Sequence, residues 1–194
     1  MATYNSVIPT LDLSHVKATS WRDNHPHFEP YYTFSQATSL TGGFNLNQWW
    51  SHPNGLPQRL HVDLNVATVI RRVYYENSHH TYATQFEPDM YGTGTGVKEF
   101  TLWGSNSSSD FDDHTYANAG TWTQLSTSVA QLDRHSDADA PDPKYFSVNN
   151  STAYRYYAFK CSSSWGLTGM GVRRIEMQTE IPPLQSPFPT FHRV

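Results

Sequence analysis

Short runs of alternating apolar and polar residues recur along the chain, separated by clusters of Gly, Pro, Asn, Asp and Ser. In residues 58–64, Leu60, Val62 and Leu64 share one face, as in a strand whose side chains point alternately to the two sides of a sheet. The same alternation predicts strands over residues 69–75, 97–103, 121–125, 153–161 and 171–178. Clear helical periodicity is hard to find, so the pattern predicts an all-β antiparallel sandwich.

The segments between these strands are long. Residues 41–57, 76–96, 104–120 and 133–143 are rich in turn-forming and polar residues. Loops of this length in a compact domain are usually functional or poorly ordered. A chain of 194 residues suits one all-β domain, expected over residues 1–180 with an N-terminal arm. Residues 181–194 hold four prolines and are expected to form an extended linker or tail.

Composition supports strands and narrows the functions. Aromatic residues make up 14% of the chain, which favours strands and would also suit a sugar-binding surface. The net charge is −4 and no basic run occurs, so nucleic-acid binding is not expected. No apolar run reaches the length of a membrane span, and the N-terminus lacks the pattern of a signal peptide. We therefore expect no membrane insertion.

Catalytic motifs are missing from the sequence. It contains no Gly-x-Ser-x-Gly elbow, no His-Glu-x-x-His pair and no phosphate-binding loop. Cys161 is the single cysteine, so no intrachain disulfide can form; its position in a predicted strand indicates a small buried hydrophobe. We expect a protein that is not an enzyme.

Six motifs occur in a familiar order. They are Trp49-Trp50, residues 60–64 (Leu-His-Val-Asp-Leu), 97–105 (Val-Lys-Glu-Phe-Thr-Leu-Trp-Gly-Ser), 121–125 (Thr-Trp-Thr-Gln-Leu), 154–159 (Tyr-Arg-Tyr-Tyr-Ala-Phe) and 171–177 (Gly-Val-Arg-Arg-Ile-Glu-Met). In them the chain resembles the discoidin or coagulation factor 5/8 type C family, within the galactose-binding-like jelly-roll group. The version seen here is most similar to modules of phage virion and tail proteins.

The resemblance implies a β-sandwich with binding loops gathered at one end. It implies a non-catalytic carbohydrate-binding module that attaches a virion, tail or multidomain protein to a cell-surface or polysaccharide ligand. The expected place is a virion or the extracellular side of a cell, with a homo-oligomer or virion proteins as further partners. The alternative is a structural adaptor that mediates protein–protein contacts. An accessory domain of a glycoside hydrolase would differ only in its neighbouring sequence.

The first candidate site is the loop that contains Trp49, Trp50, His52 and Asn54. In sugar-binding relatives the matching loop supplies an aromatic platform and a histidine. An indole face can stack on the C–H patch of a pyranose, while imidazole and amide groups bond its hydroxyls. The alternative is that one of the two tryptophans belongs to the core.

The second candidate site follows the predicted strand 69–75 and contains Glu76, Asn77, His79 and Tyr82. These side chains offer hydrogen bonds to polyol oxygens. Galactose-binding relatives place an Arg at this point, and its absence here speaks against galactose specificity. The alternative is a solvated loop without a ligand.

The third candidate is Trp165, which stands among small polar residues between the last two predicted strands. Relatives often carry a ligand-stacking aromatic residue here, so an exposed ring is expected. The alternative is a lid over the core, held by the ring N–H.

A structural Ca²⁺ ion is a further possibility, because relatives often hold one through an early loop and a Glu near the last strand. Glu176 is the residue that matches that Glu. The early loop, residues 33–38, lacks the expected Asp, although Ca²⁺ prefers charged oxygen ligands.

Overall fold

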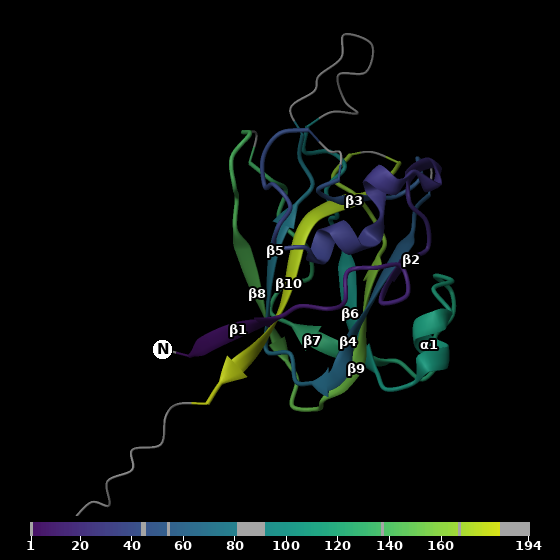
Figure 1. Cartoon of the computed structure of the whole chain (residues 1–194), viewed down its shortest axis with the longest axis vertical. Helices are drawn as coiled ribbons and strands as arrows, with labels where there is room; N and C mark the ends of the chain where they lie inside the picture. The colour runs from purple at the N-terminus through teal and green to yellow at the C-terminus, as the bar shows by residue number, and fades with distance from the viewer. Residues whose placement is uncertain are drawn as a thin grey trace, which may run out of the picture.

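The computed structural model describes residues 2–43, 46–53, 55–80, 92–136, 138–166 and 168–182. Antiparallel strands form two packed layers (Figure 1). The first layer runs in the order β1 (Thr3–Val7), β10 (Gly171–Ile181), β5 (Arg72–Asn77) and β8 (Lys144–Asn149), and β3 (Trp49–Trp50) also pairs with β10. The second runs β7 (Thr123–Thr127), β6 (Phe100–Ser105), β9 (Tyr154–Cys161), β4 (Gln58–Thr68) and β2 (Val16–Ala18).

The two layers are joined along one edge, where β7 pairs with β8 through Ser126–Asn149 and Thr127–Val148. The helices are short: α1 (Ser108–Asp112) and three 3₁₀ turns, η1 (Arg22–Asn24), η2 (Pro26–Phe28) and η3 (Pro30–Phe34). The predicted all-β sandwich is therefore confirmed. No helix among the described ranges is long and apolar enough to cross a membrane.

All six strands predicted from the alternating pattern are present, with ends displaced by up to four residues. The prediction for residues 69–75, for example, corresponds to β5, which begins at Arg72. Strands β1, β2, β3 and β8 are not among the predicted ones. The N-terminal arm contains β1, which pairs with β10 from Thr3–Ile181 to Val7–Met177. The Pro-rich segment from residue 183 onward lies outside the described residues.

The main core fills the space between the layers. Leu60 and Val62 of β4 and Phe159 of β9 face Val73 of β5 and Ile175 of β10 from the opposite layer. Each of these side chains is at most 2% exposed. Cys161 lies in the same core, where burial raises the pKa of its thiol to about 12. The interpretation of this cysteine as a small buried hydrophobe is therefore confirmed.

A smaller apolar cluster covers the outer face of the second layer and is named here the outer cluster. It consists of Phe111, Trp122, Tyr156 and Ala158, with Trp103 packed against it. Helix α1 carries Phe111 over β9, and Figure 1 shows this helix on the outside of the sandwich.

The outer cluster also buries His61 of β4, which is 0% exposed. The Nδ1 atom of His61 lies 3.0 Å from the carbonyl oxygen of Phe111, so Nδ1–H donates to that carbonyl. Burial lowers the pKa of His61 to about 4, because the protonated ring would lose its hydration.

We predict that His61 makes folding sensitive to acid. The unfolded chain binds a proton at His61 near pH 6.5 and the folded chain only near pH 4, so the free energy of unfolding falls as pH drops through this window. The contribution is about 1.4 kcal/mol per pH unit. In urea unfolding at pH 7 and pH 5, the free energy of unfolding should change less with pH for His61→Asn than for the wild type. The Asn amide N–H can still donate to the Phe111 carbonyl. His52→Asn is the control, because the His52 side chain is 57% exposed. Equal pH dependence in wild type and His61→Asn would contradict this assignment.

Candidate functional site

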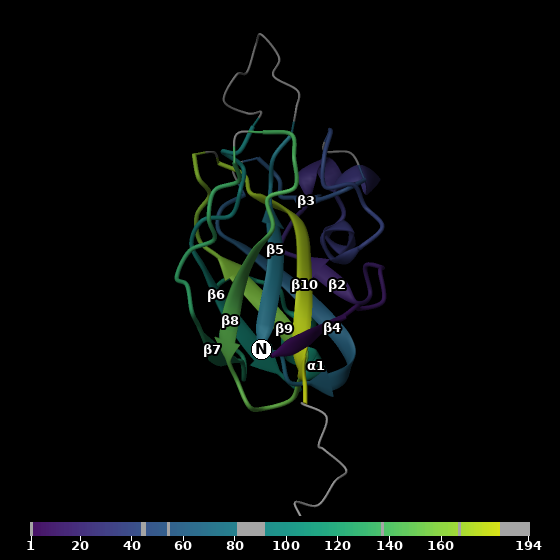
Figure 2. The ribbon, with the colours of Figure 1, turned by 90° about the vertical axis from the view of Figure 1, so that its left-hand side faces the viewer.

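Several long loops meet at one end of the sandwich, the upper end in Figures 1 and 2, which is named here the loop end. Backbone and side-chain contacts join these loops. Val97 pairs with Ser164, Ser51 N–H donates to the Met170 carbonyl at 2.8 Å, and Gly42 N–H donates to Asp139 at 2.6 Å. The strands thus bring the described residues of all three sequence-predicted sites to the same end of the molecule.

Trp49 and Trp50 are interior residues. Strand β3 pairs with β10 through Gly171–Trp50 and Val172–Trp49, which draws both indoles inward. Trp49 is 0% exposed and donates its ring N–H to the Ser20 carbonyl at 3.0 Å. Trp50 is 3% exposed.

Trp50 is covered by residues from the 3₁₀ turns. The Phe28 ring meets it edge-on at 5.7 Å, and the Arg22 guanidinium lies 4.6 Å from its ring centre. The expectation that one of the two tryptophans is exposed is therefore wrong. Pairing of β3 with β10 places both under the loops, so neither ring presents a face to a ligand.

Glu76 and Asn77, at the end of β5, are also buried, at 0% and 2% exposure. The Glu76 carboxylate accepts the Tyr74 hydroxyl at 2.6 Å and the Asp142 backbone N–H at 2.7 Å. Asn77 donates its amide N–H groups to the carbonyls of Val97, at 2.7 Å, and Asp133, at 2.9 Å. The alternative of a solvated loop is wrong for these two residues, and their polar atoms brace the loops.

His79 stacks on His135 with ring centres 3.7 Å apart, and both are buried at 3% exposure. The His135 Nε2 atom lies 3.8 Å from the Glu76 carboxylate, and the His79 Nε2 atom lies 3.6 Å from that of Asp139. Burial, with the positive charge of Arg173 second, lowers the pKa of His79 to about 3. His79 is therefore a neutral packing residue and is not open to solvent.

Arg173 of β10 ties this region together. Its side chain is fully buried, and its guanidinium donates to the carbonyls of Ser39 at 3.3 Å, Thr41 at 3.1 Å, Gly42 at 3.1 Å and His79. Burial lowers the pKa of Arg173 to about 10, which leaves it charged at neutral pH. A charged, planar donor group therefore serves two loops at once.

The residues considered for a Ca²⁺ site do not fit that ion. The Glu176 carboxylate accepts the Ser6 hydroxyl at 2.6 Å, and the Thr38 carbonyl of the early loop accepts from the Arg174 guanidinium. The Arg174 guanidinium at Thr38 would repel a divalent cation placed on this loop. Within the described part of the chain, no group of three or more His, Cys, Asp or Glu side chains is placed to hold a metal ion.

Trp165 is half-buried at the loop end. Its ring N–H donates to the Leu132 carbonyl at 3.1 Å, and its backbone N–H donates to the Gly96 carbonyl at 3.0 Å. The Lys98 ammonium lies 5.1 Å from the ring centre. The ring N–H is thus hydrogen-bonded, as expected for a lid over the core, while part of the ring faces solvent, as expected for an exposed ring. Each of the two expectations for Trp165 holds in part.

His52 is exposed, and its Nε2 atom lies 3.8 Å from Asp23. Asn54 and Tyr82 lie outside the described residues. Sequence reasoning missed Lys98, His135 and Arg173 as parts of this end. Lys98 carried no signal of its own, and His135 stands in residues 133–143, a segment predicted as a polar loop.

Comparison with known proteins supports the fold and leaves the ligand open. No protein-family model matches the chain, and no curated protein matches its sequence. Among solved structures, a variant of chitosan-binding module 1 from a chitosanase/glucanase of Paenibacillus sp. IK-5 matches with a TM-score of 0.57 at 16% identity, covering 91% of this chain and 100% of that one.

Two further structures match over a similar extent. The family 32 carbohydrate-binding module of NanJ from C. perfringens, in complex with galactose, has a TM-score of 0.53 and 13% identity, covering 91% of this chain and 100% of the module. The F5/8 type C domain of a Bacteroides fragilis protein has a TM-score of 0.55 and 9% identity, covering 91% and 99%. The predicted discoidin-like fold is confirmed, and at these identities the likeness extends to the fold alone.

We predict that Arg173, and not a metal ion, holds the loop end together. Arg173→Lys keeps the charge but cannot reach four carbonyls, so the free energy of unfolding should fall by about 2–4 kcal/mol. Arg71→Lys is the matched control, with a side chain 39% exposed, and should change stability by less than about 1 kcal/mol. In thermal unfolding of the wild type, Ca²⁺ and EDTA should leave Tm unchanged. A Tm that rises with Ca²⁺ would contradict this account.

Proposed function

We propose that the chain is a non-catalytic carbohydrate-binding module that grips a sugar unit at the loop end with Trp165. The observation that carries the proposal is the fixed, half-buried indole of Trp165, whose N–H is tied to the Leu132 carbonyl at 3.1 Å. A ring that is already oriented loses little conformational entropy when it stacks on a ligand.

The surroundings of Trp165 suit a polyol. Lys98 places an ammonium 5.1 Å from the ring centre, and Ser163 carries a hydroxyl that lies 3.0 Å from the Glu99 carboxylate. An aromatic face next to charged and hydroxyl groups can contact both the C–H patch and the oxygens of a pyranose. His52 is also exposed at this end and offers a further polar group.

The fold neighbours support the same conclusion by analogy. A chitosan-binding module and a module solved with galactose share this architecture. Their ligands differ, so the sugar bound by this chain has to follow from its own side chains.

A shallow site of this kind binds weakly when alone, and linked copies raise the avidity without any new contact. A virion or tail assembly, as the sequence resemblance implies, would supply such copies. That setting is part of the proposal and agrees with an attachment role.

The test is a glycan array of neutral, amino and acidic oligosaccharides, followed by calorimetric titration of the best binder. Trp165→Ala should weaken binding by about 2 kcal/mol, roughly thirtyfold, because the stacking face is lost. Trp165→Phe keeps an aromatic face but loses the hydrogen bond from the ring N–H. Its affinity for the sugar should lie between those of the wild type and Trp165→Ala. Tyr145→Ala is the control, since Tyr145 is an aromatic residue 51% exposed on the first layer. Unchanged affinity in a folded Trp165→Ala protein would overturn the site.

A further inference from the structure

A second aromatic surface lies away from the loop end, on the outer face of the second layer, and is named here the Trp103 patch. It contains Trp103 of β6, Tyr116 from the segment after α1, and Lys160 of β9, all half-buried. The Lys160 ammonium lies 5.3 Å from the Trp103 ring centre and 4.9 Å from that of Tyr116. The patch therefore joins two partly exposed rings to one positive charge.

The Trp103 ring is fixed in place before any ligand arrives. Its N–H donates to the Thr101 hydroxyl at 2.7 Å, and the ring packs against the outer cluster. One side of the indole is thus anchored, while the rest remains partly open. The same combination of a tied N–H and a partly open ring is found at Trp165.

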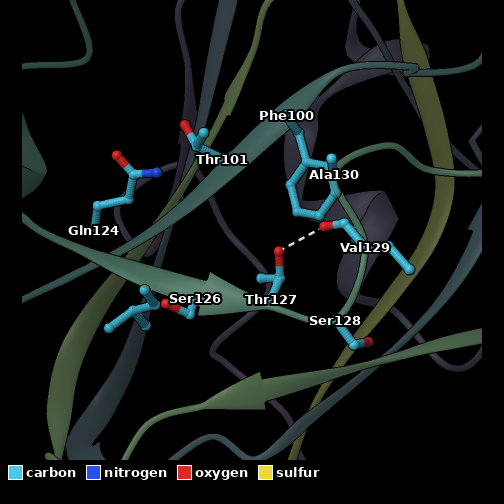
Figure 3. Close-up of a pocket in the computed structure, with 9 residues that line it drawn as sticks. Phe100, Thr101, Gln124, Ser126, Thr127, Ser128, Val129 and Ala130 are labelled. Carbon is cyan, nitrogen blue, oxygen red and sulfur yellow. Dashed lines mark hydrogen bonds between the residues drawn. The ribbon is translucent and has the colours of Figure 1, made fainter.

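A recess adjoins the patch. Strand β7 pairs with β6 up to Leu125 and then turns to β8 at Ser126, which opens a recess of about 450 Å³ between the strands. Thr101 and Gln124 lie at one end of this recess in Figure 3. Because Gln124 is the register partner of Trp103, the two side chains share one face of the sheet, where the exposed amide can offer hydrogen bonds.

The charge of the patch lacks a partner. Lys160 has no ion pair within the described ranges, whereas Lys17, on the same face of the layer, binds Asp112 at 2.6 Å. The register partner of Lys160 on β4 is Arg59, a second cation. Burial and the Arg59 charge both lower the pKa of Lys160. An anion placed here would be stabilised by the positive charges of Lys160 and Arg59.

The nearby carboxylates are already committed to other donors. Asp110 accepts from Ser105 at 2.6 Å and from the Thr121 hydroxyl at 2.6 Å. Asp113 accepts the Thr115 backbone N–H at 3.0 Å and the Asn118 amide. Among the described residues, neither carboxylate pairs with Lys160, so its ammonium is available to an anion from outside.

We propose that Trp103, Lys160 and Gln124 form a second saccharide-binding surface, for sugar units that carry a carboxylate. The ring supplies the stacking face, the ammonium pairs with the carboxylate, and the amide bonds neighbouring hydroxyls. The inference takes the ligand class, a saccharide, from the proposed function, but its residues are separate from those around Trp165.

The experiment follows the indole N–H signals of the full chain by NMR during titration with short oligosaccharides of alginate and of polygalacturonate. Each probe is compared with its esterified, uncharged form. The acidic probes should shift the Trp103 signal in a saturable way, and the esters should shift it far less. A Trp103 signal that does not respond to either acidic probe would overturn the proposal.

The two sites can fail independently. A response of Trp165 alone supports the proposed function and overturns the second surface. A response of Trp103 that persists in Trp165→Ala supports the second surface whatever happens at the loop end. A silent Trp165 across the same probes and the glycan array counts only against the loop-end site.

Charge variants give a matched comparison on the same sheet face. Lys160→Met keeps the aliphatic stem over the rings and should weaken the Trp103 response roughly fivefold. Lys17→Met also removes an ammonium next to an aromatic ring, 4.6 Å from the centre of Phe111, and should leave that response unchanged. Equal effects of the two substitutions would mean that only the overall charge matters, which would overturn the assignment to Lys160.

Discussion

The loop end depends on one interaction, the buried guanidinium of Arg173 and the loop carbonyls that it serves. Carbonyl groups turned inward by long loops must find donors, or each costs about 1–3 kcal/mol. Arg173 reaches Ser39, Thr41 and Gly42 on one side and His79 on the other. Loops from distant parts of the chain are thereby fixed in one arrangement at the end of the sandwich where Trp165 also lies.

Alternation of apolar residues was enough to predict the strands that build the sandwich. It worked for β4 because Leu60, Val62 and Leu64 alternate without interruption. It overlooked β8, although Phe146 and Val148 are buried and alternate with more exposed neighbours. The run is short, and β8 follows the segment 133–143 that was predicted as a loop, while its partner β5 lies about 70 residues earlier in the sequence.

The same reasoning located the loop end but misjudged which side chains are exposed there. Trp49 and Trp50 were candidates because indoles suit sugars, yet pairing of β3 with β10 buries both. Glu76 and Asn77 became internal donors and acceptors because loop backbone folds over the end of β5. Burial of a loop residue depends on contacts that are distant in sequence, and a single sequence does not contain them in readable form. Trp165, surrounded by small residues, was the case in which local composition was informative.

Tryptophan therefore has two roles in this fold, as a core residue and as a partly exposed ring proposed to contact a ligand. A hydrogen bond from the ring N–H is found in both roles and does not distinguish them. Trp49 is tied to a carbonyl and fully buried, whereas Trp165 is tied to a carbonyl and half-open. The difference lies in the neighbours of each ring. Trp49 is enclosed by strand pairing, whereas Trp165 and Trp103 each have a lysine ammonium near the ring, 5.1 Å and 5.3 Å from the ring centre. Trp165 contacts Lys98 and Leu132, whereas Trp103 contacts Lys160 and Thr101. Because these neighbours differ, short oligosaccharides should occupy the two surfaces separately.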